Sequence, residues 1–168
     1  MRPDTGEKWG DMWEALEQLS WVQKFSQTGW MYASVSVVHY FSIFVFIGTI
    51  VILDLRLLGL TARRQTLTQL ADQLSPWTWT FLTLALVSGF LEFTTSAGDY
   101  VQTWPFRVKM LVILAAIVFT VIVRWNISRW DRLPALPTSA KVLAAVSLAL
   151  WIGSILAGTE IAALTGLG

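Results

Sequence analysis

The 168-residue chain has no cysteine and few charged side chains. Without cysteine it can form no disulfide, no thiolate metal site, no thiol-based active site and no covalent link to a c-type haem. Only 14% of its residues are Asp, Glu, Lys or Arg, against about 25% in ordinary soluble domains. The net charge of +1 gives no basic footprint for nucleic acid. The sequence also lacks a phosphate-binding glycine loop, a nucleophile elbow and an HExxH motif, so it does not indicate soluble-enzyme chemistry.

Apolar residues are abundant instead and gather in four long stretches. They make up 55% of the chain, and the mean hydropathy is +0.58. At 1.5 Å per residue, each stretch is long enough to cross a hydrocarbon layer of about 30 Å. The spans are predicted at about 33–58, 77–95, 106–123 and 142–164. The sequence therefore predicts an all-α fold, an integral membrane four-helix bundle that forms a single membrane domain over 1–168.

The segments outside the spans have distinct characters. Residues 1–29 read as a polar lead followed by an amphipathic helix, which is expected to lie in the membrane interface or to pack on the rim of the bundle. Residues 61–75 predict a short surface helix, and Pro76 is expected to open the second span. Arginines concentrate in the first and third loops, which the positive-inside rule assigns to the cytoplasm, leaving both termini outside. Tryptophans are expected at both interfaces, with Trp77, Trp79, Trp125 and Trp130 at the inner one.

Four short motifs occur along the chain from Trp13 onward. They are His39…Gly48…Asp54-Leu55-Arg56-Leu57-Leu58-Gly59, Pro76-Trp77, Ser88-Gly89 and Pro105-Phe106-Arg107-Val108-Lys109-Met110. Together they resemble a family of small four-helix bacterial membrane proteins of unknown function. A histidine early in the first helix and a lysine early in the third are more loosely similar to copper-resistance permeases and small haem b membrane proteins. The resemblance implies the fold and a place in the bacterial inner (cytoplasmic) membrane but supplies no activity. In that membrane, the positive-inside rule puts both termini on the periplasmic side.

His39, the only histidine, lies inside the first span, where an ionisable group costs about 2.5–3.5 kcal/mol and so marks a candidate site. In the predicted topology, the other spans bring polar or ligating groups to a similar depth, about 5–9 Å from the outer boundary. These groups are Glu92, Lys109, Met110 and Glu160. We expect Lys109 to pair with Glu92 or Glu160. The alternative is a buried neutral histidine with a hydroxyl partner. The candidate hydroxyls are those of Ser36, Ser42 and Tyr32.

The hypothesis for this outer site is a bound haem b that serves electron transfer or redox sensing. His39 would be one axial ligand, and Met110, or His39 of a second chain in a homodimer, would be the other. Arg107 and Lys109 would face the haem propionates. The second version is a copper or iron site built from His39, Glu92 and Glu160.

Two alternatives need no cofactor. One is a non-enzymatic structural or accessory subunit of a membrane complex, and the other is small-molecule or ion transport. No catalytic residue is assigned, and the expected partners are the lipid bilayer and either further copies of the chain or a membrane complex. At the inner end, Asp54 and Arg56 are predicted to be structural charges, with Arg124 or a backbone cap as the partner of Asp54. Gly48, Gly89, Gly153 and Gly158 are expected to allow close helix approach.

Overall fold

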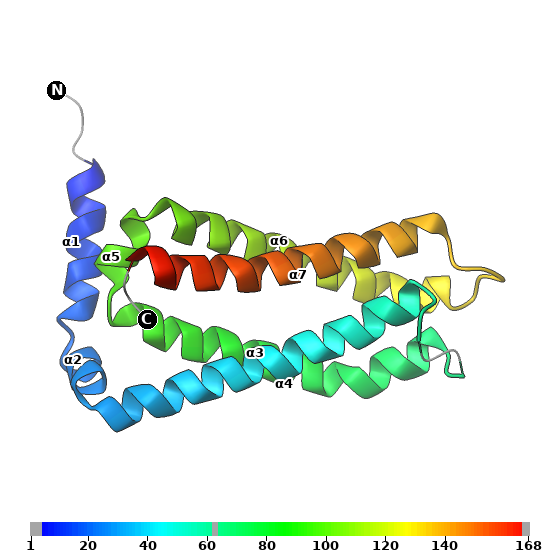
Figure 1. Ribbon diagram of the computed structural model, residues 1–168, viewed down its shortest axis with the longest axis horizontal. Coiled ribbons are helices and arrows are strands. Elements are labelled where there is room, and N and C mark those ends of the chain that lie inside the picture. Colours follow the sequence, from blue (N-terminus) through cyan, green and yellow to red (C-terminus); the bar gives the residue numbers. More distant parts are fainter. Residues whose placement is uncertain (1–4, 62–63, 166–168) are drawn as a thin grey trace.

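The computed structural model describes residues 5–61 and 64–165, with side chains for residues 10, 12–61 and 64–157. The regular elements in this part of the chain are all helices. Four long helices form the bundle (Figure 1). They are α3 (Gly29–Leu57), α4 (Leu67–Thr94), α6 (Trp104–Trp130) and α7 (Thr138–Thr165). Three shorter helices are α1 (Thr5–Glu17), α2 (Ser20–Gln27) and α5 (Ala97–Gln102). The predicted all-α class is confirmed.

The four long helices match the thickness of a bilayer. They contain 27 to 29 residues each, or about 40–44 Å at 1.5 Å per residue, which equals a hydrocarbon core with its interfacial regions. All four are apolar enough to cross a membrane. Their surfaces are rich in exposed aliphatic and aromatic side chains, such as Phe44 (73%) and Leu111 (66%), which lipid would cover. The chain is a multi-pass membrane protein.

The bundle consists of two antiparallel hairpins. Helix α3 packs along α4, and α6 packs along α7; α3 also contacts α7, whereas α4 and α6 touch over a smaller area. One end of the bundle carries α1, α2 and α5, and α1 runs across it (Figure 1). We call this the capped end, and the opposite end, with the connections 58–66 and 131–137, the loop end.

Helix α4 begins earlier than the sequence predicts. In place of a surface helix followed by a break, one helix runs through Pro76. Its start is stabilised by a capping box, because the Thr66 hydroxyl accepts from the Gln69 N–H and the Gln69 side chain accepts from the Thr66 N–H. The first turn is buried, with Leu67 at 2% exposure. This burial outweighs the one backbone hydrogen bond that Pro76 cannot donate.

Apolar packing is concentrated at the loop end and in the middle of the bundle. The loop-end cluster comprises Leu57, Leu67, Ala71, Val123, Ile127, Trp130, Ala140 and Ala144. The middle cluster comprises Phe46, Ile50, Leu82, Ala116 and Trp151. Trp130 is 6% exposed and fills the loop-end core, whereas Trp125 is 79% exposed. Their place at the inner membrane interface stays a prediction.

The amphipathic N-terminal segment forms two helices that pack on the bundle rim. Helix α1 contacts α5, and α2 contacts α3. The Glu17 carboxylate at the end of α1 accepts a 2.7 Å hydrogen bond from the Gly98 N–H of α5. The Trp13 ring meets Phe93 of α4 edge to face at 5.6 Å between centroids. These contacts support the rim-packing alternative and leave burial in the membrane interface as a prediction.

Candidate functional site at the capped end

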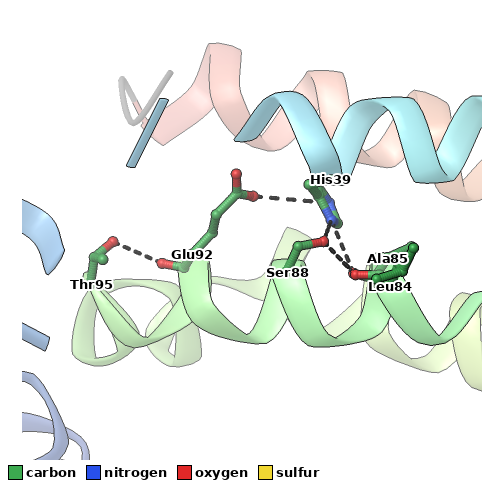
Figure 2. A network of polar contacts seen from close by, with 6 residues as sticks. All are labelled: His39, Leu84, Ala85, Ser88, Glu92 and Thr95. Carbon is green, nitrogen blue, oxygen red and sulfur yellow. Dashed lines mark hydrogen bonds and ion pairs between the residues drawn. The ribbon is translucent and has the colours of Figure 1, made fainter. Parts of the chain in front are cut away.

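His39 joins α3 to α4 in the half of the membrane span nearer the capped end. Its Nδ1 lies 3.0 Å from the Ala85 carbonyl oxygen and 3.0 Å from the Ser88 hydroxyl (Figure 2). The Ser88 hydroxyl donates to the Leu84 carbonyl at 2.6 Å, so it is free to accept from the imidazole. Both neighbours of Nδ1 are therefore acceptors, and Nδ1 carries a proton. The hydroxyl predicted for this histidine exists, but it belongs to Ser88 on α4 rather than to Tyr32, Ser36 or Ser42 on α3.

Gly89 makes this arrangement possible. A Cβ atom at position 89 would lie 2.7 Å from His39 Cε1 and 3.3 Å from Nδ1, inside van der Waals contact. The imidazole thus lies against bare backbone, beside Ser88 and one helical turn from Ala85. Of the glycines predicted to allow close helix approach, three have described surroundings. Gly89 is the only one of these three in a close contact, since Gly48 and Gly153 have nothing within 4 Å of an added Cβ. Gly158 lies outside the residues whose side-chain surroundings are described.

The second ring nitrogen of His39 is left for a ligand or a proton. With Nδ1 protonated, neutral His39 has its lone pair on Nε2. The nearest charged atom is Glu92 Oε2 at 3.9 Å, and both side chains are largely enclosed, at 17% and 19% exposure. A distance of 3.9 Å is too long for a hydrogen bond. Figure 2 shows the Glu92 side chain turned back along α4 toward the imidazole.

Further ionisable groups surround Glu92. Lys109 of α6 is half-buried and close enough for its charge to interact with Glu92, although in the described part of the chain it has no carboxylate within 4.0 Å. The expected Lys109–Glu92 association is thus electrostatic rather than a direct ion pair. In α5, burial raises the pKa of the Tyr100 phenol, and nearby Tyr32 and Glu92 raise it further. That phenol is therefore neutral near pH 7 and can donate a hydrogen bond.

Aromatic rings close the capped end beside this network. Phe93, next to Glu92 in the chain, stacks on Phe106 of α6 at 5.3 Å and contacts Tyr100 of α5 at 6.4 Å. Tyr100 and Phe106 are also neighbours, at 5.5 Å. With Trp13 edge-on to Phe93, these rings tie α1, α5 and α6 to the last turns of α4. They form a rigid apolar cover over the end of the span.

The remaining predicted site residues lie apart from His39. Met110 is 47% exposed, and among the described residues it makes no polar contact. Arg107 donates from Nε to the Val101 carbonyl at 2.9 Å, so its guanidinium fastens α5 to the start of α6. The side chain of Glu160 lies outside the described residues. Among the residues whose side chains are described (10, 12–61 and 64–157), no three or more His, Cys, Asp or Glu side chains form a cluster that could hold a metal ion.

The charges at the loop end also differ from expectation. Arg124 pairs with Asp72 at 2.8 Å, not with Asp54. Asp54 instead interacts with the Ser147 hydroxyl of α7. Arg56 donates to the Gln65 carbonyl at 3.0 Å, which holds it at the loop end. The predicted Arg124 partner of Asp54 is wrong. Asp72 lies in the part of α4 that was expected to be a separate surface helix, and there it faces Arg124 and pairs with it.

Sequence reasoning missed most of the groups that orient His39. Ser88 stands only in a motif of the resemblance, Gly89 is predicted to allow close helix approach but not to contact His39, and a backbone carbonyl such as that of Ala85 leaves no trace in a sequence. The signal that could have found them is the serine–glycine pair in the second span, because a small residue beside a hydroxyl suits the close approach of a polar side chain from a neighbouring helix.

The fold and site define a class: a small multi-pass membrane protein with four spanning helices and a histidine-centred polar network near one end. The chain belongs to the family of unknown function DUF6644, whose model matches residues 12–163. No curated protein and no solved structure matches the chain. The family match supplies no activity, and the looser similarity to copper-resistance permeases and haem b proteins stays a prediction.

Proposed function

We propose that the protein binds haem b at the capped end, with Nε2 of His39 as an axial ligand. The observation that carries the proposal is the orientation of the imidazole. Nδ1 is held by the Ala85 carbonyl and the Ser88 hydroxyl at 3.0 Å each, and Nε2 has no hydrogen-bond partner among the described residues. Metal-bound histidines are typically held in this way, because a hydrogen bond from the other ring nitrogen fixes the tautomer and strengthens the ligand.

The donor set near His39 suits this group. A neutral imidazole is the usual protein ligand for haem iron in b-type sites, and a bound haem would supply one-electron transfer for an electron-transfer or redox-sensing role. Lys109 would offset the negative charge of Glu92 and of the propionates. Arg107 supports the proposal less, because its Nε is bonded to Val101. The second axial position is assigned to Met110 or to His39 of a second chain, and the 47% exposure of Met110 favours the second chain.

A copper or iron ion without porphyrin is the second form of the proposal. Two ligands that are each about 2.1 Å from a tetrahedral ion lie about 3.4 Å apart. The 3.9 Å between His39 Nε2 and Glu92 Oε2 is close to this, so a small rotation of the Glu92 side chain would bring both onto one ion. Glu160 is the proposed third ligand.

The test is an absorption spectrum and a metal analysis of the full chain, purified in detergent from haem-replete cells. We expect a Soret band that shifts on reduction, or gains intensity when haemin is added. His39→Ala and His39→Gln should abolish it, and Gln retains volume and hydrogen bonding if Ala disturbs folding. Thr83→Val is the matched control, because Thr83 is exposed on α4 and its hydroxyl donates only to the Trp79 carbonyl of the same helix.

A structural role is the competing function, and the same contacts favour it. The imidazole bonds across α3 and α4, the most extensively packed helix pair, and so acts as a clamp. A wild-type protein with no Soret band, no copper or iron and no response to haemin would reject the cofactor proposal. Loss of stability in His39→Ala without any spectral change would then assign His39 to the clamp.

A further inference from the structure

Asp54 forms a second buried ionisable site, at the loop end and distinct from the His39 network. Its side chain is 2% exposed. The Ser147 hydroxyl interacts with the carboxyl group, but Oδ2 accepts no hydrogen bond from any residue in the described part of the chain. An ionised carboxylate buried in this way carries a large desolvation cost unless a cation or a proton neutralises it.

The neighbouring charged groups do not provide that cation. On its own helix, Arg56 points its guanidinium to the Gln65 carbonyl at 3.0 Å. Across from it, Arg124 of α6 is held by Asp72 of α4 at 2.8 Å. Within 5–61 and 64–157, no lysine or arginine nitrogen lies within 4.0 Å of the Asp54 carboxylate. Asp72, in contrast, is 65% exposed, so Arg124 pairs with the more exposed of the two carboxylates and leaves the buried one without a cation.

A small cavity joins Asp54 to polar side chains of the three neighbouring long helices. Its volume is about 20 Å³, which is enough for about one water molecule. The polar side chains that line it are Asp54, Ser75, Thr78, Thr120, Arg124 and Ser147. Through Arg124, which is 27% exposed, the cavity reaches toward the surface. A water molecule and hydroxyl groups of this kind can pass a proton between a buried carboxyl group and bulk solvent.

Aromatic rings lie on the capped-end side of this cavity. The Phe46 ring meets Trp151 edge to face at 4.6 Å, within the apolar middle cluster. The Trp151 indole N–H is itself committed to the Thr120 hydroxyl at 3.1 Å. This aromatic pair lies between the Asp54 cavity and His39, so the exposed Arg124 side of the cavity is the shorter way from Asp54 to the surface.

We propose that Asp54 is a proton-binding site that exchanges its proton with the loop-end side of the membrane through the cavity it shares with Arg124. A hydronium ion transfers a proton to Oδ2: one O–H bond of the hydronium breaks, one O–H bond forms on the carboxyl group, and a water molecule is left. The acid form removes the uncompensated charge and can donate to the cavity water. The proposal does not rest on a cofactor at His39.

The experiment is labelling of the full chain with dicyclohexylcarbodiimide, which reacts with protonated carboxyl groups in apolar surroundings, followed by mass spectrometry across a pH series. We expect an adduct at Asp54 that declines as the pH rises, and its loss in Asp54→Asn. Asp99→Asn is the control. Asp99 is exposed in α5, so it is not a target of the reagent, and this variant should form the Asp54 adduct to the same extent as the wild type. Infrared difference spectra of the wild-type protein should show the carboxylic acid band of Asp54 disappearing over the same pH range.

Absence of both the adduct and the carboxylic acid band at every pH would overturn the proposal, since Asp54 would then be permanently ionised. Protection from labelling by sodium but not potassium at constant pH would also overturn it, in favour of a metal cation site. If Asp54→Asn does not fold, Ser147→Ala replaces it. Removal of the neighbouring hydroxyl should shift the pH dependence of both readouts, and an unchanged pH dependence would count against the site.

Discussion

Replacing Gly89 with alanine is the sharpest test of the geometry around His39. The added methyl group would lie 2.7 Å from Cε1, 3.3 Å from Nδ1 and 3.5 Å from Nε2 of the imidazole. The ring cannot remain in place at these distances. It must swing away from α4, and because Nδ1 is bonded to Ala85 and Ser88 on that same helix, the movement breaks the hydrogen bonds that fix the ring.

The expected cost follows from three terms. Loss of the imidazole hydrogen bond costs about 0.5–1.5 kcal/mol, and overpacking of a tight contact costs about 1–3 kcal/mol. Alanine offsets up to about 1 kcal/mol through its higher helix propensity. Gly89→Ala should therefore lower the free energy of unfolding by about 0.5–3.5 kcal/mol when the full propensity gain of alanine is subtracted. With His39→Ala already present, only the propensity gain remains, so the same substitution should be neutral or stabilising.

The measurement is a double-mutant cycle, with reversible unfolding in mixed micelles followed by circular dichroism. The coupling between positions 39 and 89 should equal the hydrogen-bond and overpacking terms together, about 1.5–4.5 kcal/mol, against about 0.5–3 kcal/mol for most residues in contact. Gly48→Ala serves as the control, because an added Cβ there meets nothing within 4 Å. Equal effects of Gly89→Ala with and without the imidazole would refute the reasoning. If haem binds, Gly89→Ala should also weaken the Soret band.

Two further predictions concern contacts outside the spans. Partial desolvation raises the pKa of Asp131, but hydrogen bonds from Leu67 (2.9 Å) and Thr68 (3.3 Å) outweigh it and hold the pKa below its usual value. The ionised carboxylate therefore stabilises the fold above about pH 4, and this stabilisation is lost as the pH falls through the lowered pKa. Asp131→Asn should lower the free energy of unfolding by about 1 kcal/mol at pH 7 and not at all in strong acid. Unfolding curves at both pH values would show the difference. Glu17→Ala removes the acceptor of the Gly98 N–H and should speed hydrogen exchange in α1 and α5 while leaving exchange in the four spans unchanged; equal exchange in α1 would contradict the docking.

The two ionisable sites give the bundle a polar group toward each end. His39 and Glu92 lie toward the capped end, and Asp54 lies toward the loop end. The Phe46–Trp151 pair, with ring centroids 4.6 Å apart, lies between them.

Much of the architecture could be predicted from the sequence. The apolar stretches that became α3, α4, α6 and α7 are each long enough for a bilayer, and the hydrophobic effect acts on their summed composition without regard to order. Backbone hydrogen bonding in lipid then requires helices. The position of His39 within a span, and its company with Glu92 and Lys109, also followed from counting residues along helices of known rise.

Partner choice required the tertiary structure. Whether His39 meets Ser42 or Ser88, and whether Arg124 meets Asp54 or Asp72, depends on how far each helix is rotated and shifted against its neighbours. One residue changes the direction of a side chain by about 100°, whereas hydropathy averages over whole turns. The sequence by itself therefore determined the spans and the ionisable groups at each end. Only packing decided which of those groups are paired, that Gly89 is the glycine that admits the imidazole, and that Asp54 is the carboxylate without a cationic partner.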